Sequence, residues 1–210
     1  MAALHRHQIA WLSAVGWQRL LGGNWDTEAL DCLGHWAERG LPLVVTRQRD
    51  DNGIALGLCA PHRWNHRRIA LRVERTEVLY FDEFPRLDQV LTQLPQSIRA
   101  SARQLALALQ GCGATARVYG SHGWQHITGL QHVREGSDLD VWVGVGSKEQ
   151  ADAAAAALNA FASPSRRLDG ELVFDGNAAV AWREWLAWRS GGPQALLVKR
   201  LNGASMEALA

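Results

Sequence analysis

The 210-residue sequence predicts an α+β protein with an N-terminal α+β unit in residues 1–82 and a second unit in residues 83–210. Segments with helical spacing and β-branched apolar runs that are typical of strands occur together along the chain. The second unit is expected to contain a small mixed sheet flanked by helices. The expected boundary lies around residues 82–85, where Pro85 interrupts regular secondary structure.

The N-terminal unit begins with "RHQIAWLSAVGWQRL" and continues into the expected helix "NWDTEALDCLGHWAERG". Asn24 or Asp26 can cap the start of this helix, and Gly40 can end it. The segment "LPLVVTRQRDDNGIALGLCAP" has two apolar runs around an Asn-Gly turn, which is typical of a β-hairpin. The run "RRIALRVERTEVLY" predicts a further strand or a pair of strands.

The second unit begins with helical segments "EFPRLDQVLTQLP" and "QSIRASARQLALALQ", interrupted by Pro95. Strand "RVYGS", a short helix and strand "DLDVWVGV" follow, and "SKEQADAAAAALNAF" predicts a helix with a capping box from Ser147 and Gln150. The run "RRLDGELVFDGNAAVAW" predicts strand, turn and strand. A helix "WREWLAWRSGGP" stopped by glycines and a last strand or helix "QALLVKRL" complete the chain.

Charge and composition exclude several classes of protein. The formal net charge is +1, whereas nucleic-acid binding usually leaves a basic footprint. The three cysteines are scattered, which favours reduced thiols, and no apolar run reaches the roughly 18 residues of a membrane span. We therefore expect a cytoplasmic protein that binds neither nucleic acid nor membrane.

The most informative stretch is "RVYGSHGWQHITGLQHVREGSDLDVWVGV", in which two aspartates open an apolar strand. Strand side chains alternate, so Asp138 and Asp140 share one face, about 5 to 7 Å apart, while Leu139 and Val141 face the core. Two carboxylates this close repel unless a cation neutralises them, and Mg²⁺ prefers such hard oxygen ligands. Solvated acids at a strand entry are the alternative for this motif taken alone.

The pair Gly120 and Ser121 adds a second chemical element. Glycine permits close approach of a ligand to the backbone, and successive N–H groups at the start of a short helix bind anions. Taken alone, a Gly-Ser pair after a strand is usually a turn. Followed by Asp138 and Asp140, it predicts a phosphate site next to a metal site, as nucleotidyl transfer needs.

The pattern "YGS…SDLDVWV" resembles the DNA polymerase β-like nucleotidyltransferase superfamily, which joins a Gly-Ser turn, an Asp-x-Asp strand and a third carboxylate on a later strand. The interval of sixteen residues between Ser121 and Asp138 is longer than usual there. The resemblance implies a polymerase β-like nucleotidyltransferase domain in residues 83–210.

Nearly the whole chain is similar to one narrower family, the phosphoribosyl-dephospho-CoA transferases, or holo-acyl carrier protein synthases of malonate decarboxylase. The similarity includes "YGSHGWQHITGLQHVREGSDLDVWV", "RRLDGELVFDGNAAVAWREW" and "LLVKR", with weaker matches in "RHQIAWL", "LPLVVTRQ" and "RRIALRV". It implies transfer of 2′-(5″-phosphoribosyl)-3′-dephospho-CoA from triphosphoribosyl-dephospho-CoA to a serine of the acyl carrier protein subunit of malonate decarboxylase, with release of pyrophosphate. A nucleotidyltransferase of the same fold with another acceptor is the alternative.

The third carboxylate is either Asp169 or Glu171, which have the same strand parity. Asp169 precedes a glycine and could equally belong to a turn, but Asp175–Gly176 offers a competing hairpin turn. If the later pair forms the hairpin, both candidates lie on one strand face, and we expect Asp169 to be the closer to the metal. The superfamily pattern implies a base or a third metal ligand here.

Other candidates concern cations, histidines and tryptophans. Lys199, within an apolar stretch, is the favoured cation for the donor phosphates; the other candidates are Arg67, Arg68, Arg134 and Arg183. The histidines His122, His126 and His132 are expected to contact substrate or lie on the surface rather than bind zinc. The tryptophans at helical spacing are expected to pack in the core: Trp182, Trp185 and Trp188.

Overall fold

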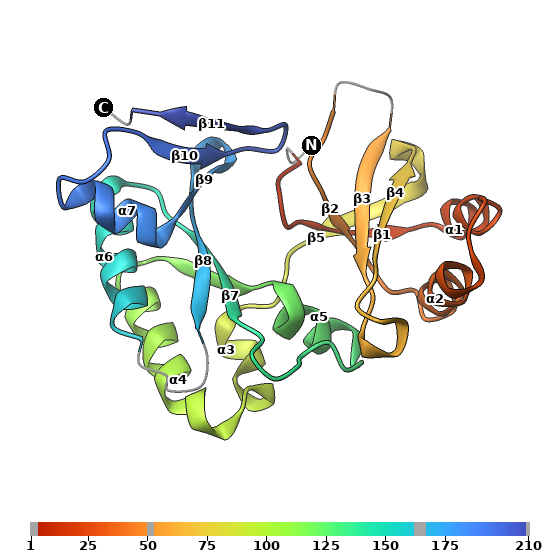
Figure 1. The fold of residues 1–210 in the computed structure, drawn as a ribbon, viewed down its shortest axis with the longest axis horizontal. Helices are drawn as coiled ribbons and strands as arrows, with labels where there is room; N and C mark the ends of the chain where they lie inside the picture. Colours follow the sequence, from red (N-terminus) through yellow and green to blue (C-terminus); the bar gives the residue numbers. More distant parts are fainter. Residues whose placement is uncertain (1–3, 50–52, 162–166, 209–210) are drawn as a thin grey trace.

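The computed structural model describes residues 4–49, 53–161 and 167–208, which form two sheets with separate cores. Figure 1 shows the two sheets side by side, with α1 and α2 on the outer side of the first and α4, α6 and α7 on the outer side of the second. The α+β class is therefore confirmed. The expected domain boundary after residue 82 stays a prediction.

The N-terminal sheet has the strand order β4-β3-β2-β1-β5, with every neighbouring pair antiparallel. Its strands are β1 (Ile9–Leu12), β2 (Leu43–Val45), β3 (Ile54–Cys59), β4 (Arg68–Val73) and β5 (Val78–Asp82). The predicted hairpin is confirmed in β2 and β3, although Asn52 of its predicted Asn-Gly turn lies outside the described residues. The segment "RRIALRVERTEVLY" does form two strands, but β4 and β5 lie at opposite edges of the sheet.

One face of this sheet packs on two helices, α1 (Ala14–Leu21) and α2 (Thr27–Glu38). Of the two predicted caps, Asp26 is the one that begins α2, because its side chain accepts the N–H of Ala29. Gly40 follows the helix with a φ of +57°, a conformation that glycine adopts without strain. Buried residues such as Leu33 and Trp36 then fill the core beneath the sheet.

The C-terminal sheet has the order β11-β10-β9-β8-β7-β6 and is mixed, since β7 and β8 run parallel and the other pairs antiparallel. Its strands are β6 (Thr115–Val118), β7 (Leu139–Gly144), β8 (Leu168–Phe174), β9 (Ala178–Ala181), β10 (Leu196–Lys199) and β11 (Ala204–Glu207). "QALLVKRL" forms a strand, and β11 is an additional strand that the sequence did not predict.

The C-terminal helices are α3 (Leu87–Val90), α4 (Gln96–Gly111), α5 (Gly120–Thr128), α6 (Lys148–Asn159) and α7 (Trp182–Arg189). Short 3₁₀ turns are η1 (His62–Trp64), η2 (Arg75–Glu77), η3 (Leu91–Gln93) and η4 (Asp175–Asn177). Pro95 begins α4 as expected. Trp182 and Trp185 are buried in the core, and Trp188 packs against it, which confirms the prediction for these residues.

The predicted capping box of α6 is only half formed. Ser147 Oγ accepts the Gln150 N–H at 3.1 Å, as predicted. The Gln150 carboxamide oxygen instead accepts the N–H of Gly146, and its nitrogen donates to the carbonyl of Cys112. Gln150 therefore fixes the loop before β6 as well as the start of α6.

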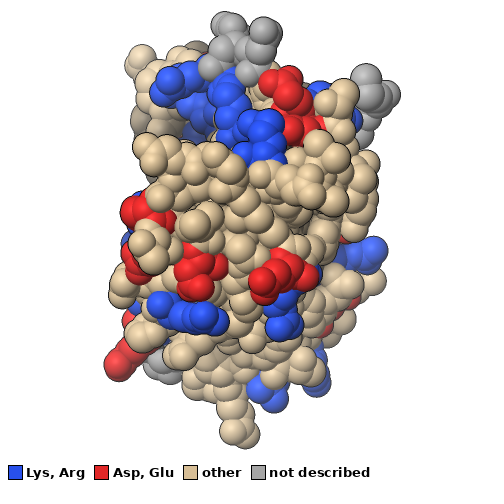
Figure 2. Space-filling model, turned by 90° about the vertical axis from the view of Figure 1, so that its right-hand side faces the viewer, with Lys and Arg blue, Asp and Glu red and all other residues tan. Residues whose placement is uncertain are grey.

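The described chain contains no helix that is both long and apolar enough to cross a membrane. On the face that carries α1 and α2, several basic side chains gather at the upper edge, and smaller acidic and basic groups lie below on a largely uncharged surface (Figure 2). This mixture accords with a formal net charge of +1. All three cysteines, Cys32, Cys59 and Cys112, are free thiols.

Candidate active site

The two aspartates of the acidic strand lie as the alternation predicts. Leu139 and Val141 are completely buried in the C-terminal core, whereas Asp140 is only partly buried on the opposite face. That face is turned toward the N-terminal sheet (Figure 1). Asp138 comes immediately before β7, so its carboxylate lies at the strand entrance.

Asp169 lies directly beside Asp140, because the parallel register of β7 and β8 pairs the two residues. Neighbouring strands are about 4.8 Å apart. Gly170 has a φ of +153°, and a Cβ built on it would lie 2.1 Å from the Val141 carbonyl oxygen. This glycine therefore permits the close approach of two strands and makes no turn. The hairpin turn is formed by the later pair, Asp175–Gly176.

The carboxylates of this acidic cluster, Asp138, Asp140 and Asp169, are short of positive charge. Burial, together with the charges of Asp138 and Asp169, raises the pKa of Asp140 to about 7, despite an opposing effect of Arg167. Arg167 is largely exposed and contacts the outer two acids, at 3.5 Å from Asp138 and 2.8 Å from Asp169. The Asp140 carboxylate thus lies among like charges, as expected of a group whose charge an external cation neutralises.

The Gly-Ser pair begins helix α5 against this cluster. The N–H of Tyr119 donates to the Asp140 carbonyl at 3.1 Å and so ties the helix start to β7. Gly120 has a φ of +60°, and a Cβ on it would lie 2.1 Å from Asp140 Oδ2. Only glycine fits there, and its absent side chain lets the first N–H groups of α5 lie beside the carboxylate. Helix starts of this kind bind phosphate.

A polar cleft of about 420 Å³ contains Gly120, Ser121, Asp138 and Asp140. One wall comes from the C-terminal unit and the other from strands β3 and β4 of the N-terminal unit. The N-terminal wall consists of Cys59, Ala60, His66 and Arg68. The cleft therefore belongs to both units, which the sequence could not establish.

The residues present fit a magnesium ion better than zinc. Within the described residues, no group of three or more His, Cys, Asp or Glu side chains is arranged to hold a metal by itself. Mg²⁺ does not need such a cage, since it is usually bound by one or two carboxylates, with water and substrate phosphates completing the set. Asp138 and Asp140 supply such carboxylates, and the raised pKa of Asp140 reflects the cost of ionising it without a cation.

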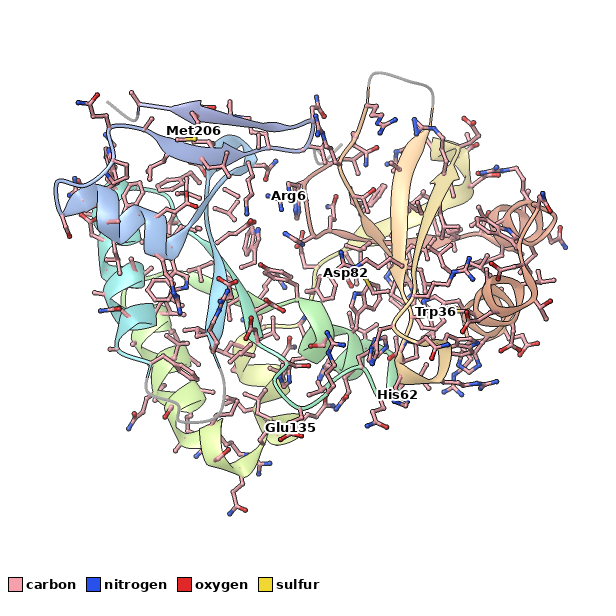
Figure 3. All side chains as sticks on the ribbon, viewed as in Figure 1. Arg6, Trp36, His62, Asp82, Glu135 and Met206 are labelled. Carbon is pink, nitrogen blue, oxygen red and sulfur yellow. The ribbon has the colours of Figure 1, made fainter. Side chains whose placement is uncertain are left out.

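Glu171 lies on the same face as Asp140 but in different surroundings. It pairs in register with Trp142, farther along the two strands, and only 6% of its side chain is exposed. Lys199 Nζ lies 2.8 Å from Oε1, while Arg6 and His7 lie 3.2 and 3.5 Å from Oε2. Figure 3 shows Arg6 between the two sheets. We call Glu171 with these three partners the Glu171 cluster.

The cations of the Glu171 cluster neutralise the Glu171 carboxylate. Burial alone would raise the pKa of Glu171, but hydrogen bonds from His7 and Lys199 and the charge of Arg6 lower it to about 2. His7 also stacks on Tyr119, with ring centroids 4.2 Å apart. The cluster thus joins the N-terminal segment to β8, β10 and the start of α5. Lys199, the cation favoured for donor phosphates, is engaged with Glu171, and its donor contact stays a prediction.

The remaining candidate cations lie in different places. Arg67 pairs with Asp26 at 2.6 Å, and Arg183 covers the ring of Trp182, so both are engaged away from the cleft lining. Arg68 and Arg134 do line the cleft. No sequence signal indicated Arg6, His7 or His66, because their importance arises only where distant segments meet.

The histidines of the long interval are more buried than expected. His122 and His132 are only 5% and 4% exposed, so surface placement is wrong for these two. Burial, aided by His66, lowers the pKa of His132 to about 4, which leaves it neutral between Trp36 and Trp124. His132 also reaches the cleft lining.

Comparison with known proteins identifies this architecture. Residues 5–84 match the model of the phosphoribosyl-dephospho-CoA transferase MdcG N-terminal domain, and residues 86–209 match that of the MdcG C-terminal domain. Both models describe a transferase, and together they cover nearly all of the sequence. The chain therefore belongs to the phosphoribosyl-dephospho-CoA transferase MdcG family.

Individual relatives agree with this assignment. A phosphoribosyl-dephospho-CoA transferase of Bradyrhizobium diazoefficiens is 36% identical over 201 residues, which cover 94% of this chain and 87% of the relative. That of Xanthomonas campestris pv. campestris strain 8004 is 30% identical, with 96% and 92% covered, and that of Xanthomonas euvesicatoria pv. vesicatoria is 31% identical, with 92% and 89% covered. No solved structure matches the chain significantly.

Proposed function

We propose that the chain transfers 2′-(5″-phosphoribosyl)-3′-dephospho-CoA from triphosphoribosyl-dephospho-CoA to a serine of the apo acyl carrier protein subunit of malonate decarboxylase, with release of pyrophosphate. Membership of the phosphoribosyl-dephospho-CoA transferase family supports this donor, and the acceptor is the one that the resemblance implies. The observation that carries the proposal is the contact between Gly120 and Asp140, where a Cβ would lie 2.1 Å from the carboxylate. It brings a phosphate-binding helix start and an acidic metal-binding strand into one cleft.

In this proposal the serine hydroxyl oxygen attacks the phosphorus nearest the ribose of the donor. The bond from that phosphorus to the bridging oxygen breaks, and pyrophosphate leaves with the electron pair. The N–H groups at Gly120 and Ser121 bind the departing phosphates. Asp169, level with Asp140 on the neighbouring strand, accepts the hydroxyl proton.

Asp138 and Asp140 would hold Mg²⁺, which supplies charge neutralisation at the phosphates and a lowered pKa for the attacking hydroxyl. The cleft would hold the donor phosphates beside Asp140, whose register partner on β8 is Asp169. Glu171 takes no chemical part here, because it is almost wholly buried and bound by Arg6, His7 and Lys199. Asp169 is instead 40% exposed, and its one ion-pair partner among the described residues is the exposed Arg167.

The experiment is an intact-mass measurement of the apo carrier subunit after incubation with the donor, Mg²⁺ and this protein. A mass gain equal to phosphoribosyl-dephospho-CoA, lost when the carrier serine is replaced by alanine, supports the proposal. No gain on this carrier, together with nucleotide incorporation into a different acceptor, would instead favour a nucleotidyltransferase of other specificity. No incorporation into any acceptor would refute transfer altogether.

A further inference from the structure

The wall of the cleft opposite the acidic cluster is built by the N-terminal sheet. Strand β4 begins at Arg68, and alternation places its side chain on one face and Ile69 and Leu71 on the other. Ile69 and Leu71 are buried in the N-terminal core. Arg68 therefore points away from that core and lines the cleft beside Cys59, its register partner on β3.

Packing between the units holds this wall in place. Ile9, Phe84 and Trp124 form a small apolar cluster to which Cys59 contributes. Trp124 belongs to α5, the helix that begins at Gly120, and it also lines the cleft. The position of Arg68 relative to the phosphate-binding helix start is thus fixed by a buried contact.

A backbone hydrogen bond reinforces this packing at the lower end of the wall. The N–H of His62 donates to the carbonyl of Gln131 at 2.9 Å, joining the two units just before the turn that leads to Arg68. Arg68 and His66 follow within a few residues. The wall is therefore joined to the C-terminal unit at two points, Cys59 and His62.

Both walls of the cleft carry charged side chains. The acids Asp138 and Asp140 lie on the C-terminal wall together with Arg134, and Arg68 with His66 lies on the N-terminal wall. Within the described part of the chain, Arg68 forms no ion pair, unlike its neighbour Arg67, which binds Asp26. A ligand that reaches from one wall to the other must present negative charge to Arg68, and a chain of phosphates does so.

We propose that Arg68, with His66 beside it, binds the polyphosphate chain of the donor, so that the N-terminal unit supplies half of the donor site. The inference rests on the proposed function for the identity of the donor alone. The recognition that it states, of a polyphosphate by an arginine on the N-terminal wall, is independent of the acceptor and of the transfer step.

The experiment measures binding of inorganic triphosphate to the full chain by calorimetry in excess Mg²⁺. Arg68→Gln should weaken binding about tenfold or more, since it removes a charge-assisted hydrogen bond. Arg39→Gln is the matched control, because Arg39 is an exposed arginine of the same unit outside the cleft. It should bind within about twofold of the unaltered protein.

Two further variants make the test decisive. Arg68→Lys should recover part of the lost affinity, because it restores the charge, and His66→Gln should cost about threefold. Thermal unfolding checks that Arg68→Gln is folded. Equal triphosphate binding by Arg68→Gln and the unaltered protein, or no binding by the unaltered protein, would overturn the inference. If transfer to the carrier fails while the Arg68 effect remains, the proposed function fails and this inference stands.

Discussion

Asp140 on β7 and Glu171 on β8 project from the same face of the C-terminal sheet, yet the protein surrounds their charges in opposite ways. Glu171 is contacted by Arg6, His7 and Lys199, and its pKa falls to about 2. Asp140 lies among other carboxylates, and its pKa rises to about 7. The chain's own cations neutralise the charge of Glu171, whereas the charge of Asp140 is not neutralised in this way.

On this difference we base the proposal that Glu171 has a structural role and Asp140 a chemical one. A buried carboxylate with its own cations has no free lone pairs to offer a metal or a proton, and losing it leaves uncompensated positive charge. A carboxylate held among like charges gains most from an external cation. Burial alone therefore does not identify the active acid; the sign of the surrounding charge does.

The largest effect is expected at Asp140. Asp140→Asn should lower the transfer rate more than about a thousandfold, because it removes a carboxylate that grips the phosphate-bound metal. The measurement is single-turnover transfer at saturating Mg²⁺, with circular dichroism to check the fold. Asp175→Asn is the control, since it makes the same substitution at an exposed aspartate in the turn after β8. Near-normal transfer by Asp140→Asn would sink the metal assignment.

The next test compares Asp169 and Glu171, the two acids of β8. Asp169→Asn should lower the transfer rate about 10²- to 10⁴-fold with the fold intact, as expected for loss of a proton acceptor. Glu171→Gln should instead destabilise the protein by about 3 kcal/mol, because Lys199 and Arg6 lose their buried partner. Its transfer rate should stay within about threefold at temperatures where it is folded.

Urea unfolding and single-turnover assays of both variants separate these outcomes. Glu207→Gln is the control for removing a carboxylate from an ion pair, since Glu207 pairs with Arg200 at the surface and should change the unfolding midpoint little. A folded but inactive Glu171→Gln protein, with nearly normal Asp169→Asn, would reverse the assignment of the two acids.

Much of the fold and part of the site could be predicted because the relevant signals are local. Alternation along "DLDVWV" placed Asp138 and Asp140 opposite a buried apolar face, and the structure agrees. The hairpin at Asp175–Gly176 follows from turn chemistry, and it leaves Asp169 on the strand. Strand parity depends only on neighbouring residues, so it needs no knowledge of the tertiary fold.

The rest depends on contacts between distant segments. Asp169 and Glu171 have the same parity, so parity could not separate a residue of the acidic cluster from one bound by Arg6, 165 positions away. Likewise, nothing near Arg68 or His66 indicates that their wall faces Asp138 and Asp140. The Asp169–Gly170 pair was ambiguous because close strand approach and a turn both require glycine.

Substitution of Gly120 tests whether Asp140 and the start of α5 act together. Gly120→Val should lower the transfer rate about a hundredfold and weaken donor binding, because its side chain would occupy the space beside Asp140 Oδ2 in a strained backbone conformation. Ser121→Ala removes one hydrogen bond of several and should cost only about three- to tenfold. Calorimetry with the donor measures both, and unchanged affinity of the valine variant would count against a phosphate site at this turn.

The remaining expected effect is on stability, and its pH dependence sharpens the comparison. The folded-state pKa of Asp140 lies above its ordinary value of 3.8, so the folded state binds this proton more tightly than the unfolded state. Stability from this group therefore falls as pH rises from about 4 to about 7. In EDTA, Asp140→Asn should be more stable than the unaltered protein by up to about 4 kcal/mol at pH 8 and nearly equal to it at pH 4.

Glu171 should behave in the opposite way, because its pKa of about 2 lies below its ordinary value of 4.5. Its contribution to stability is complete above about pH 4.5 and is lost only as pH falls toward 2, so Glu171→Gln should be destabilised at both pH 5 and pH 8.

Mg²⁺ should stabilise the unaltered protein more at pH 8 than at pH 5, since binding requires ionised Asp140, and it should stabilise Asp140→Asn little at either pH. Urea unfolding with EDTA or Mg²⁺ measures each difference. If Asp140→Asn gains no more stability at pH 8 than at pH 4, Asp140 is not held among uncompensated charges, and the contrast with Glu171 fails.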